Sequence, residues 1–339
     1  MTDKLKLKLS SRIRLARNLS QYQFPHRLDQ KNARELVHLV EEAFYVSKPL
    51  AEGFRTRLLW EERGLDLLFW FEKHLVSSKL IDHADIGAFI CNQTEDVSLM
   101  INEEDHIRLQ TMSSRKGLKE LYEEAEQLDT VLEEKLNWAF DNQLGYLTAC
   151  PTNLGTALRA SVMVHLPALT MQDRIGLIAQ KLAQMGMTIR GIYGEGSQAE
   201  GNIYQISNEV TLGISEEFIL KNIEETIDSI LVMEAAEQTK LIESRGDETR
   251  DGIYRSIGVL SQARLMSSKE ALERLSTVRL GIEAGIIHEL TTAAVDEMII
   301  RVQTGNLHRQ LGLTELMPEK DRDLLRATIL RNEMKRRLS

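Results

Sequence analysis

The sequence lacks most of the features that mark an exported or membrane-bound protein. Only two cysteines, Cys91 and Cys150, occur among its 339 residues, which is too few for a disulfide framework and favours a reducing cytoplasm. No apolar run approaches the length of a membrane span, and the opening residues MTDKLKLKLS lack the apolar core of a signal peptide. We therefore expect a cytoplasmic protein.

The chain also lacks an excess of positive charge. It has 42 lysines and arginines against 51 aspartates and glutamates, a net charge of -9, which disfavours nonspecific binding to nucleic acid or to an acidic membrane. A composition of 42% hydrophobic and 27% charged residues is typical of a folded globular protein. Since 339 residues exceed one ordinary core, we expect two domains.

Glycine-rich phosphate-binding motifs are missing as well. The sequence contains no GxxxxGK[ST] loop, and its glycines do not form a GxGxxG pattern that opens a helix. If the protein handles nucleotide phosphates, scattered arginines must bind them.

What is present centres on the stretch NEEDHIRLQTM, residues 102–112. The preceding VSLMI reads as a buried strand, and the alternation of Ile107, Leu109 and Thr111 with polar residues reads as a half-buried one. Glu103 and Glu104 thus follow one strand, while Arg108 lies on the next. Composition alone favours a solvated hairpin turn, and the alternative is a site that binds a cation with carboxylates and an anion with arginine.

Two arginines in SSRIRLARN have a spacing of two residues. On an extended segment Arg12 and Arg14 point to the same side, where like charges repel unless an anion bridges them. They are either two surface arginines or half of a phosphate clamp, because guanidinium groups match phosphate oxygens with two hydrogen bonds.

Three further features have a structural and a functional interpretation. Cys150 precedes Pro151 and is either inert packing or a thiol activated by a cation, of which Arg159 is the nearest in sequence. The glycines around Glu195 indicate a loop that closes over a ligand or a long hairpin connection. His74 falls in a segment with helical spacing, residues 65–80. It is either a packed or capping residue or a ligand.

From Ser215, an expected N-cap, every segment to the end has a helical pattern, with breaks near Gly246, Ser267, Gly305 and Pro318. We therefore predict a first domain over residues 1–230 and a helical second domain over residues 231–339.

Four motifs in order, SSRIRLARN, NEEDHIRLQTM, ACPTNLGTALRASV and RGIYGEGSQAEGNIYQISN, resemble the phosphagen (ATP:guanidino) kinases over roughly residues 10–220. Two features resemble the bacterial branch of that family. SSRIR begins almost at the N-terminus, without the small helical domain that helps to enclose free creatine or arginine, and RDLLRA near the C-terminus matches the branch's RDxxRA motif.

The resemblance implies an α+β catalytic domain, a mainly antiparallel sheet flanked by helices, followed by an all-α C-terminal domain with regulatory and dimerising roles. It implies transfer of the γ-phosphate of ATP to arginine side chains of proteins, with Mg²⁺ held through the ATP phosphates and no protein metal site. The alternatives are a kinase of a free guanidino metabolite and a non-catalytic adaptor that binds phosphoarginine.

The resemblance also implies site residues. In the acceptor site, Glu104 and Glu103 match carboxylates that hold the guanidinium, and Cys150 matches the thiol beside it. We add the hypothesis that Glu195 supplies another carboxylate, because Gln198 stands where the family has a glutamate and Tyr193 stands where it has an arginine. The expected nucleotide-binding residues are Ser10, Ser11, Arg12, Ile13, Arg14, His74, Arg108, Arg159, Ala160, Ser161, Val162, Met163, Arg190, Gly191, Ile192, Tyr193, Gly194 and Glu195. The expected phosphoarginine pocket consists of Arg322, Asp323, Arg326 and Ala327.

The partners that the resemblance implies are ATP and arginine-containing proteins, including a heat-shock repressor, in the bacterial stress response. A zinc-binding activator protein, a Clp protease that degrades the marked proteins, and a second copy of the chain in a homodimer are also implied. No nucleic-acid or membrane partner is expected.

Overall fold

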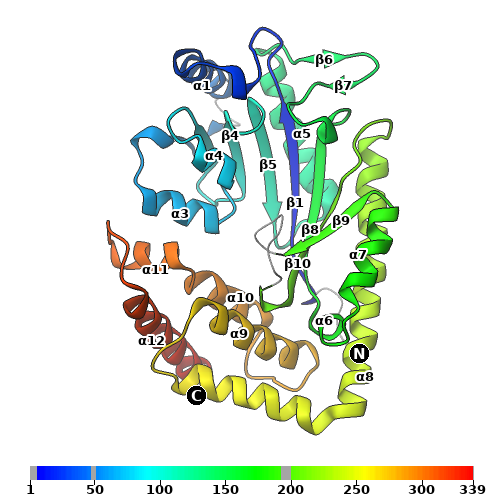
Figure 1. Ribbon diagram of the computed structural model, residues 1–339, viewed down its shortest axis with the longest axis vertical. Coiled ribbons are helices and arrows are strands. Elements are labelled where there is room, and N and C mark those ends of the chain that lie inside the picture. The colour runs from blue at the N-terminus through cyan, green and yellow to red at the C-terminus, as the bar shows by residue number, and fades with distance from the viewer. Residues whose placement is uncertain (1–5, 47–50, 192–199, 339) are drawn as a thin grey trace. The chain divides into compact units, whose positions relative to one another are not determined.

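The computed structural model describes residues 6–46, 51–191 and 200–338, and it has an α+β architecture with one large sheet (Figure 1). The large sheet has eight strands in the order β2-β3-β4-β5-β1-β8-β10-β9, and β6 and β7 form a small separate ribbon. The strands are β1 (Lys8–Arg17), β2 (Phe54–Leu58), β3 (Ala88–Asn92), β4 (Val97–Ile101), β5 (Ile107–Ser113), β6 (Phe140–Asp141), β7 (Gly145–Tyr146), β8 (Leu158–His165), β9 (Met187–Gly191) and β10 (Ile203–Asn208).

Helices occur along the whole chain and make up nearly all of its last third. They are α1 (Gln30–Tyr45), α3 (Gly64–Glu72), α4 (Ser78–Asp82), α5 (Leu118–Glu133), α6 (Pro167–Met171), α7 (Ile175–Gln184), α8 (Glu216–Gln262), α9 (Ser268–Glu283), α10 (Thr292–Arg301), α11 (Thr304–Leu311) and α12 (Glu319–Leu338). Short 3₁₀ turns are η2 (Pro25–Arg27), η3 (Leu59–Glu61), η4 (Pro151–Asn153) and η5 (Glu200–Asn202).

The strand pairs β2/β3, β3/β4, β4/β5 and β5/β1 are all antiparallel. The predicted fold class, a mainly antiparallel sheet with flanking helices and a helical C-terminal part, is therefore confirmed. The hairpin of β4 and β5 is also as predicted, with every residue of β4 buried and alternation at the start of β5.

The chain divides into two compact units. The N-terminal unit consists of Ser10–Ser161 with Ser207–Glu224, and the helical unit consists of Met1–Leu9, Val162–Ile206 and Glu225–Ser339. The chain passes from one unit to the other within β1, β8, β10 and α8, so each unit is assembled from separate stretches of sequence. The division that we predict between residues 230 and 231 stays a prediction.

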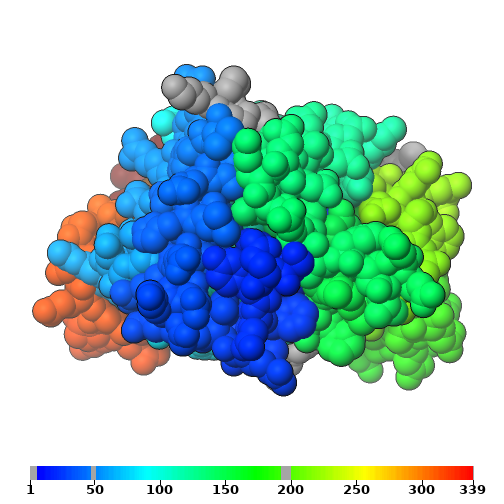
Figure 2. All heavy atoms as spheres, turned by 90° about the horizontal axis from the view of Figure 1, so that it is seen from above, coloured from blue at the N-terminus to red at the C-terminus, as the bar shows by residue number. Residues whose placement is uncertain are grey.

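Within the N-terminal unit, segments far apart in the sequence are tied together by backbone hydrogen bonds. Ser20 N donates to Asn137 O at 2.9 Å and Ala139 N donates to Asn18 O at 2.7 Å. Figure 2 shows the residues after β1, in dark blue, against green residues from the segment that follows α5. Helix α1 begins at the N-cap Asp29, whose side chain accepts from Asn32 N, and it buries an apolar face.

One helix prediction in this unit is wrong. Residues 65–80 form two short helices, α3 and α4, because the chain turns at His74, whose φ of 58° lies in the left-handed region. A residue with a side chain rarely adopts that conformation, and an α-helix cannot continue through it. Residues Leu118–Glu133, by contrast, form one continuous helix, α5.

The helical unit has its own apolar core, built from α8, α9, α10 and α12 around Leu275, Val295, Met298 and Leu330. The first residues of α8 belong to the N-terminal unit, and the predicted cap at Ser215 is present there, since Phe218 N donates to its hydroxyl at 3.3 Å. Arg245 interrupts the helical backbone of α8, next to the predicted break at Gly246. Among the residues that the structure describes, no helix is both long and apolar enough to span a bilayer.

Candidate active site

Three arginines share one face of the sheet in the N-terminal unit. In the antiparallel register of β1 with β5, Arg12 lies opposite Met112, Arg14 opposite Gln110 and Ala16 opposite Arg108. Residues two apart on a strand, and residues directly opposite on a paired strand, point to the same side of the sheet. The register therefore places Arg108 on the same face as Arg12 and Arg14.

These cations repel one another. The pKa of Arg12 is lowered to about 10, first by burial and then by the charges of Arg108 and Arg159. The pKa of Arg14 lies well below its ordinary value, again through burial first and then through Arg12, Arg108 and Arg159. Arg14 Nε is buried and has no hydrogen-bond partner among the described residues. A site with several half-buried guanidinium groups and an unsatisfied donor is one that an anion such as a phosphate would stabilise.

His74 lies beside this arginine cluster. Its pKa is lowered to about 3 by burial and then by the charges of Arg12 and Arg14, so the imidazole is neutral at neutral pH. Its left-handed backbone is held in place because Gln110 Nε2 donates to His74 O at 2.6 Å. A strained backbone of this kind is a recurring property of functional sites.

Glu103 lies in the turn that joins β4 to β5, and it is buried, with 1% of its surface exposed. Arg108 Nη1 lies 2.5 Å from Glu103 Oε1, and Ser77 Oγ donates to the same oxygen at 2.6 Å. Glu104 N donates to Glu103 Oε2 at 3.0 Å. Burial raises the pKa of Glu103, but the charge of Arg108 and these hydrogen bonds outweigh burial and leave the pKa below its ordinary value. Glu103 is thus an ionised carboxylate committed to partners inside the protein.

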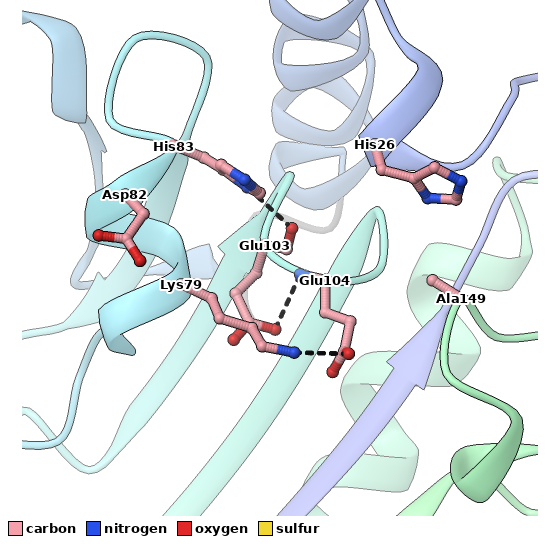
Figure 3. A pocket seen from close by; sticks show the side chains of 7 residues that line it. All are labelled: His26, Lys79, Asp82, His83, Glu103, Glu104 and Ala149. Atoms are coloured by element: carbon pink, nitrogen blue, oxygen red, sulfur yellow. Dashed lines mark hydrogen bonds and ion pairs between the residues drawn. The ribbon is translucent and has the colours of Figure 1, made fainter.

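Glu104, the next residue, turns outward into a cavity of about 300 Å³ (Figure 3). Its Oε1 accepts a hydrogen bond from Lys79 Nζ at 2.6 Å, and the Glu104 side chain stays one-quarter exposed. The cavity is lined by His26, Lys79, Asp82, His83, Glu103, Glu104 and Ala149. A partly exposed carboxylate in an open cavity is accessible to a cation of the size of a guanidinium.

Asp105 connects this turn to the segment that carries Cys150. Its Oδ1 accepts from Asn18 Nδ2 at 2.6 Å and from Ala149 N at 2.7 Å, while Asn18 Oδ1 accepts from His106 N at 2.9 Å. Burial raises the pKa of Asp105, and these bonds partly offset that effect. Asp105 therefore fixes the position of Ala149, the residue before Cys150.

Cys150 itself is a half-buried free thiol. Its Sγ lies 3.0 Å from Thr152 Oγ1, and its backbone is extended before the turn η4, as its place before a proline predicts. Ala149, the residue before Cys150, lines the cavity together with Glu104.

The remaining predicted nucleotide-binding residues fall into three groups. Ser10, Ser11, Ile13, Arg159, Ala160 and Ser161 belong to the N-terminal unit, where Arg159 Nη2 donates to Ser207 Oγ at 3.3 Å. Val162, Met163, Arg190 and Gly191 belong to β8 and β9 of the helical unit. The predictions for Ile192, Tyr193, Gly194, Glu195 and Gln198 lie outside the described residues.

The predicted phosphoarginine residues begin α12. Arg326 is buried with 2% exposure and donates to Val302 O at 2.9 Å, to Met266 O at 2.8 Å and to Asp323 Oδ1 at 2.6 Å. Arg322 is half-buried and donates to Met317 O at 3.1 Å. Ala327 is buried in the same core. Arg326 thus fastens α12 to two other segments of the helical unit, and the phosphoarginine pocket stays a prediction.

Sequence reasoning missed Lys79, Ser77 and Asn18. Ser77 carried the one usable signal, because it is the N-cap of α4 and accepts from Leu80 N at 3.1 Å. No local pattern marks Lys79 or Asn18, whose partners lie 25 and 87 residues away along the chain.

Taken together, the N-terminal unit presents an arginine cluster that fits an anion and a carboxylate that fits a cation. Arg108 joins the two, because it belongs to the arginine cluster and also holds Glu103 beside Glu104. Such an arrangement suits the transfer of a phosphoryl group to a positively charged acceptor.

Comparisons with known families agree with that arrangement. Residues 35–237 match the family model for the C-terminal catalytic domain of ATP:guanido phosphotransferases, and residues 246–338 match that for the C-terminal domain of protein-arginine kinase McsB. The chain is 45% identical over 328 residues to a protein-arginine kinase of Clostridium kluyveri, covering 97% of this chain and 94% of the relative. It is 43% identical to one of Geobacillus stearothermophilus, covering 96% and 90%.

Solved structures are similar as well. Lombricine kinase, at 25% identity, superposes with a TM-score of 0.60 over 70% of this chain and 68% of that one. The duplicated taurocyamine kinase from Schistosoma mansoni, with bound transition state analogue components, has a TM-score of 0.62 at 24% identity and covers 80% of this chain and 40% of that one. The latter likeness concerns the fold alone.

Proposed function

This chain belongs to the ATP:guanido phosphotransferase family and is an ATP-dependent protein-arginine kinase, and we propose how residues of its N-terminal unit divide the reaction. Arg12, Arg14, Arg108 and Arg159 form the anion side, which binds the phosphates of ATP. Glu104 forms the cation side, which binds the acceptor guanidinium. The support is that both sides occur within one compact unit and share Arg108 and its partner Glu103.

On the anion side, the arginines replace a glycine-rich phosphate loop. Their mutual repulsion lowers the pKa values of Arg12 and Arg14, and a bound triphosphate relieves that repulsion. The transferred phosphoryl group carries its charge on peripheral oxygens, so positioned guanidinium groups stabilise the transition state without covalent chemistry. His74, neutral beside the cluster, is available to hydrogen-bond the nucleotide without adding charge.

On the cation side, Glu104 orients the acceptor. An arginine side chain stays protonated at physiological pH and is a poor nucleophile until a carboxylate accepts its proton. We assign that role to Glu104: as the N–P bond forms, the proton of the attacking nitrogen passes to Glu104, the bond between the γ-phosphorus and the bridging oxygen breaks, and ADP leaves. Glu103 positions this residue through the bond from Glu104 N. We assign to Cys150 the place beside the guanidinium plane.

Mg²⁺ fits this site as a companion of the nucleotide. The residues of the anion side are guanidinium groups, which match phosphate oxygens and not a metal, and Glu103 is committed to Arg108 and Ser77. We therefore propose that the ATP phosphates themselves hold the ion, with no protein ligand, and that its charge supplements the arginines.

The single observation that carries this division is the partly exposed Glu104 next to the buried Glu103–Arg108 pair. The experiment is incubation of the full chain with labelled ATP, Mg²⁺, free arginine and an arginine-rich protein, under mildly basic conditions because N–P bonds are acid-labile. We expect label on arginine side chains of the protein, located by mass spectrometry. Label on the free amino acid alone would contradict the assignment to protein substrates and favour a kinase of a guanidino metabolite.

We also propose a cellular setting. Both cysteines are free thiols, which suits a cytoplasmic protein. A role in bacterial protein quality control, with a heat-shock repressor among the targets, a zinc-binding activator and a Clp protease, follows from the family resemblance. The helical unit is the proposed site of phosphoarginine regulation and of a homodimer contact.

A further inference from the structure

Lys79 forms an ion pair with Glu104, the carboxylate that we assign to the acceptor. Its Nζ lies 2.6 Å from Glu104 Oε1, and Figure 3 shows the lysine side chain reaching across the cavity to that oxygen. The Lys79 side chain is 55% exposed, so it contacts solvent while it holds Glu104. An ammonium group therefore sits where the acceptor guanidinium must bind.

The position of Lys79 is set by the helix that carries it. Helix α4 is fastened to Glu103 at both ends: Ser77, its N-cap, donates to Glu103 Oε1 at 2.6 Å, and His83, its C-cap, bonds Glu103 O through Nδ1 at 3.2 Å. Because these contacts fix a five-residue helix against Glu103, Lys79 faces the next residue, Glu104. The contact with Glu104 is thus built into the turn and does not depend on a flexible surface encounter.

The groups around Lys79 keep it charged. Burial and, to a smaller extent, the charge of Arg108 lower the pKa of Lys79. The hydrogen bond and charge of Glu104 and the charge of Glu103 raise it by more, so the pKa lies above its ordinary value. Asp82, on the same helix, and His26 and His83 also line the cavity. At neutral pH the Lys79 side chain that contacts Glu104 is consequently a charged ammonium group.

We propose that Lys79 is a resident counter-cation of Glu104 which the acceptor guanidinium displaces, so that it sets how tightly the kinase binds an acceptor arginine. This inference rests on the proposed role of Glu104. Two cations cannot share the carboxylate without repulsion, and a guanidinium that forms two parallel hydrogen bonds needs the oxygen that Lys79 holds. The planar fork of the guanidinium displaces the single point charge of the ammonium.

The energetics make the exchange feasible. An exposed lysine–glutamate pair contributes little, so its displacement weakens acceptor binding by roughly two- to fivefold. Lys79 thereby lowers the affinity for any cation at Glu104 without closing the site. When displaced, its ammonium has Asp82 one turn along α4 as an alternative partner.

The test is the binding of ethylguanidinium, a non-peptide probe of the acceptor group, to the full chain without ATP, measured by NMR titration. We expect Lys79→Met to bind the probe roughly two- to fivefold more tightly than the wild type. In steady-state assays the same variant should lower the KM for an arginine-containing protein by a similar factor and leave the KM for ATP unchanged. Unchanged or weaker probe binding would overturn the inference.

Lys116→Met is the matched control, because Lys116 forms a similarly exposed pair with Glu124 in the same unit but away from the cavity. It should bind the probe as the wild type does. Tightening of the same size in Lys116→Met would overturn the inference, because the effect would then come from the loss of any surface charge.

The background Glu104→Gln separates this inference from the proposed function. We expect Glu104→Gln to weaken probe binding, and Lys79→Met to have no further effect in that background, because the contact it removes is already gone. If Glu104→Gln left probe binding unchanged, the proposed acceptor role of Glu104 would fail. If Glu104→Gln weakened binding while Lys79→Met did not tighten it, only the inference about Lys79 would fail.

Discussion

Arg108 Nη1 lies 2.5 Å from Glu103 Oε1, so the buried carboxylate of the turn between β4 and β5 is neutralised by an arginine from the same sheet face as Arg12 and Arg14. The pair joins the two halves of the site. Arg108 is held in place by Glu103, and Glu103 in turn orients the backbone of Glu104. A change on either side is therefore transmitted to the other.

Glu103→Gln should destabilise the protein. It removes the buried partner of Arg108 and leaves that cation among other arginines, a change that costs about 3 kcal/mol in the free energy of unfolding. Urea denaturation measures this loss. Because the folded pKa of Glu103 is below its usual 4.5, its stabilising contribution is present above pH 4.5 and is lost as the pH falls through the folded pKa. The variant and the wild type should therefore converge in stability in acid, and a constant difference would contradict this account.

Glu104→Gln should reduce phosphotransfer and spare the fold. The amide keeps the shape of the side chain but cannot accept the acceptor's proton, so we expect a loss of roughly a hundredfold or more in kcat. Stability should change little, because the pair with Lys79 is exposed. Phosphoarginine formation followed by mass spectrometry, with a thermal unfolding curve as control, measures both. A wild-type rate would remove Glu104 from the role of proton acceptor.

Arg14→Met should stabilise the nucleotide-free protein while it disables the enzyme. Burial and three neighbouring arginines lower the pKa of Arg14, so its charge costs folding free energy at neutral pH. That cost is relieved only as the pH rises through the lowered pKa values, about 10 for Arg12. We expect a higher Tm without nucleotide and a smaller rise in Tm on addition of ATP with Mg²⁺. The activation free energy of phosphotransfer should rise by about 3 kcal/mol, which slows the reaction roughly a hundredfold. An unchanged response to ATP would place the phosphates elsewhere.

His74→Gln should flatten the acid limb of the stability profile. The folded pKa of His74 is about 3 and its ordinary value is 6.5, so the unfolded chain binds a proton that the folded chain excludes between these values. In the wild type this difference reduces stability as the pH falls from about 6.5 towards 3. The variant lacks this loss, and urea titrations at pH 7 and pH 5 measure the difference. Parallel pH profiles of the two proteins would contradict a buried, neutral His74.

Arg326→Ala and Arg322→Ala should differ in their effect on the helical unit. Arg326 satisfies the carbonyls of Val302 and Met266 in a buried position, so its removal should cost about 3 kcal/mol. Arg322 is less buried and has one such bond, so its removal should cost under about 1 kcal/mol. Chemical denaturation compares them. Arg322→Ala is therefore the cleaner variant for testing a response to phosphoarginine, and equal losses of stability would argue against this distinction.

The sequence by itself determined the local parts of the site. A period of two places Arg12 and Arg14 on one side of β1, a dense apolar run followed by alternation gives the hairpin of β4 and β5, and a proline after Cys150 sets its extended backbone. These properties depend on the backbone geometry of a few consecutive residues, and such geometry leaves a pattern in the sequence.

Only the tertiary structure decided how those parts meet. The register of β1 with β5 brings Arg108 to the face of Arg12 and Arg14, the burial of Glu103 separates its role from that of Glu104, and a left-handed turn at His74 divides a predicted helix in two. The contact of Lys79 with Glu104 likewise joins residues 25 apart. Pairing between distant segments depends on which strands and helices pack together, and no periodicity within either segment encodes that choice.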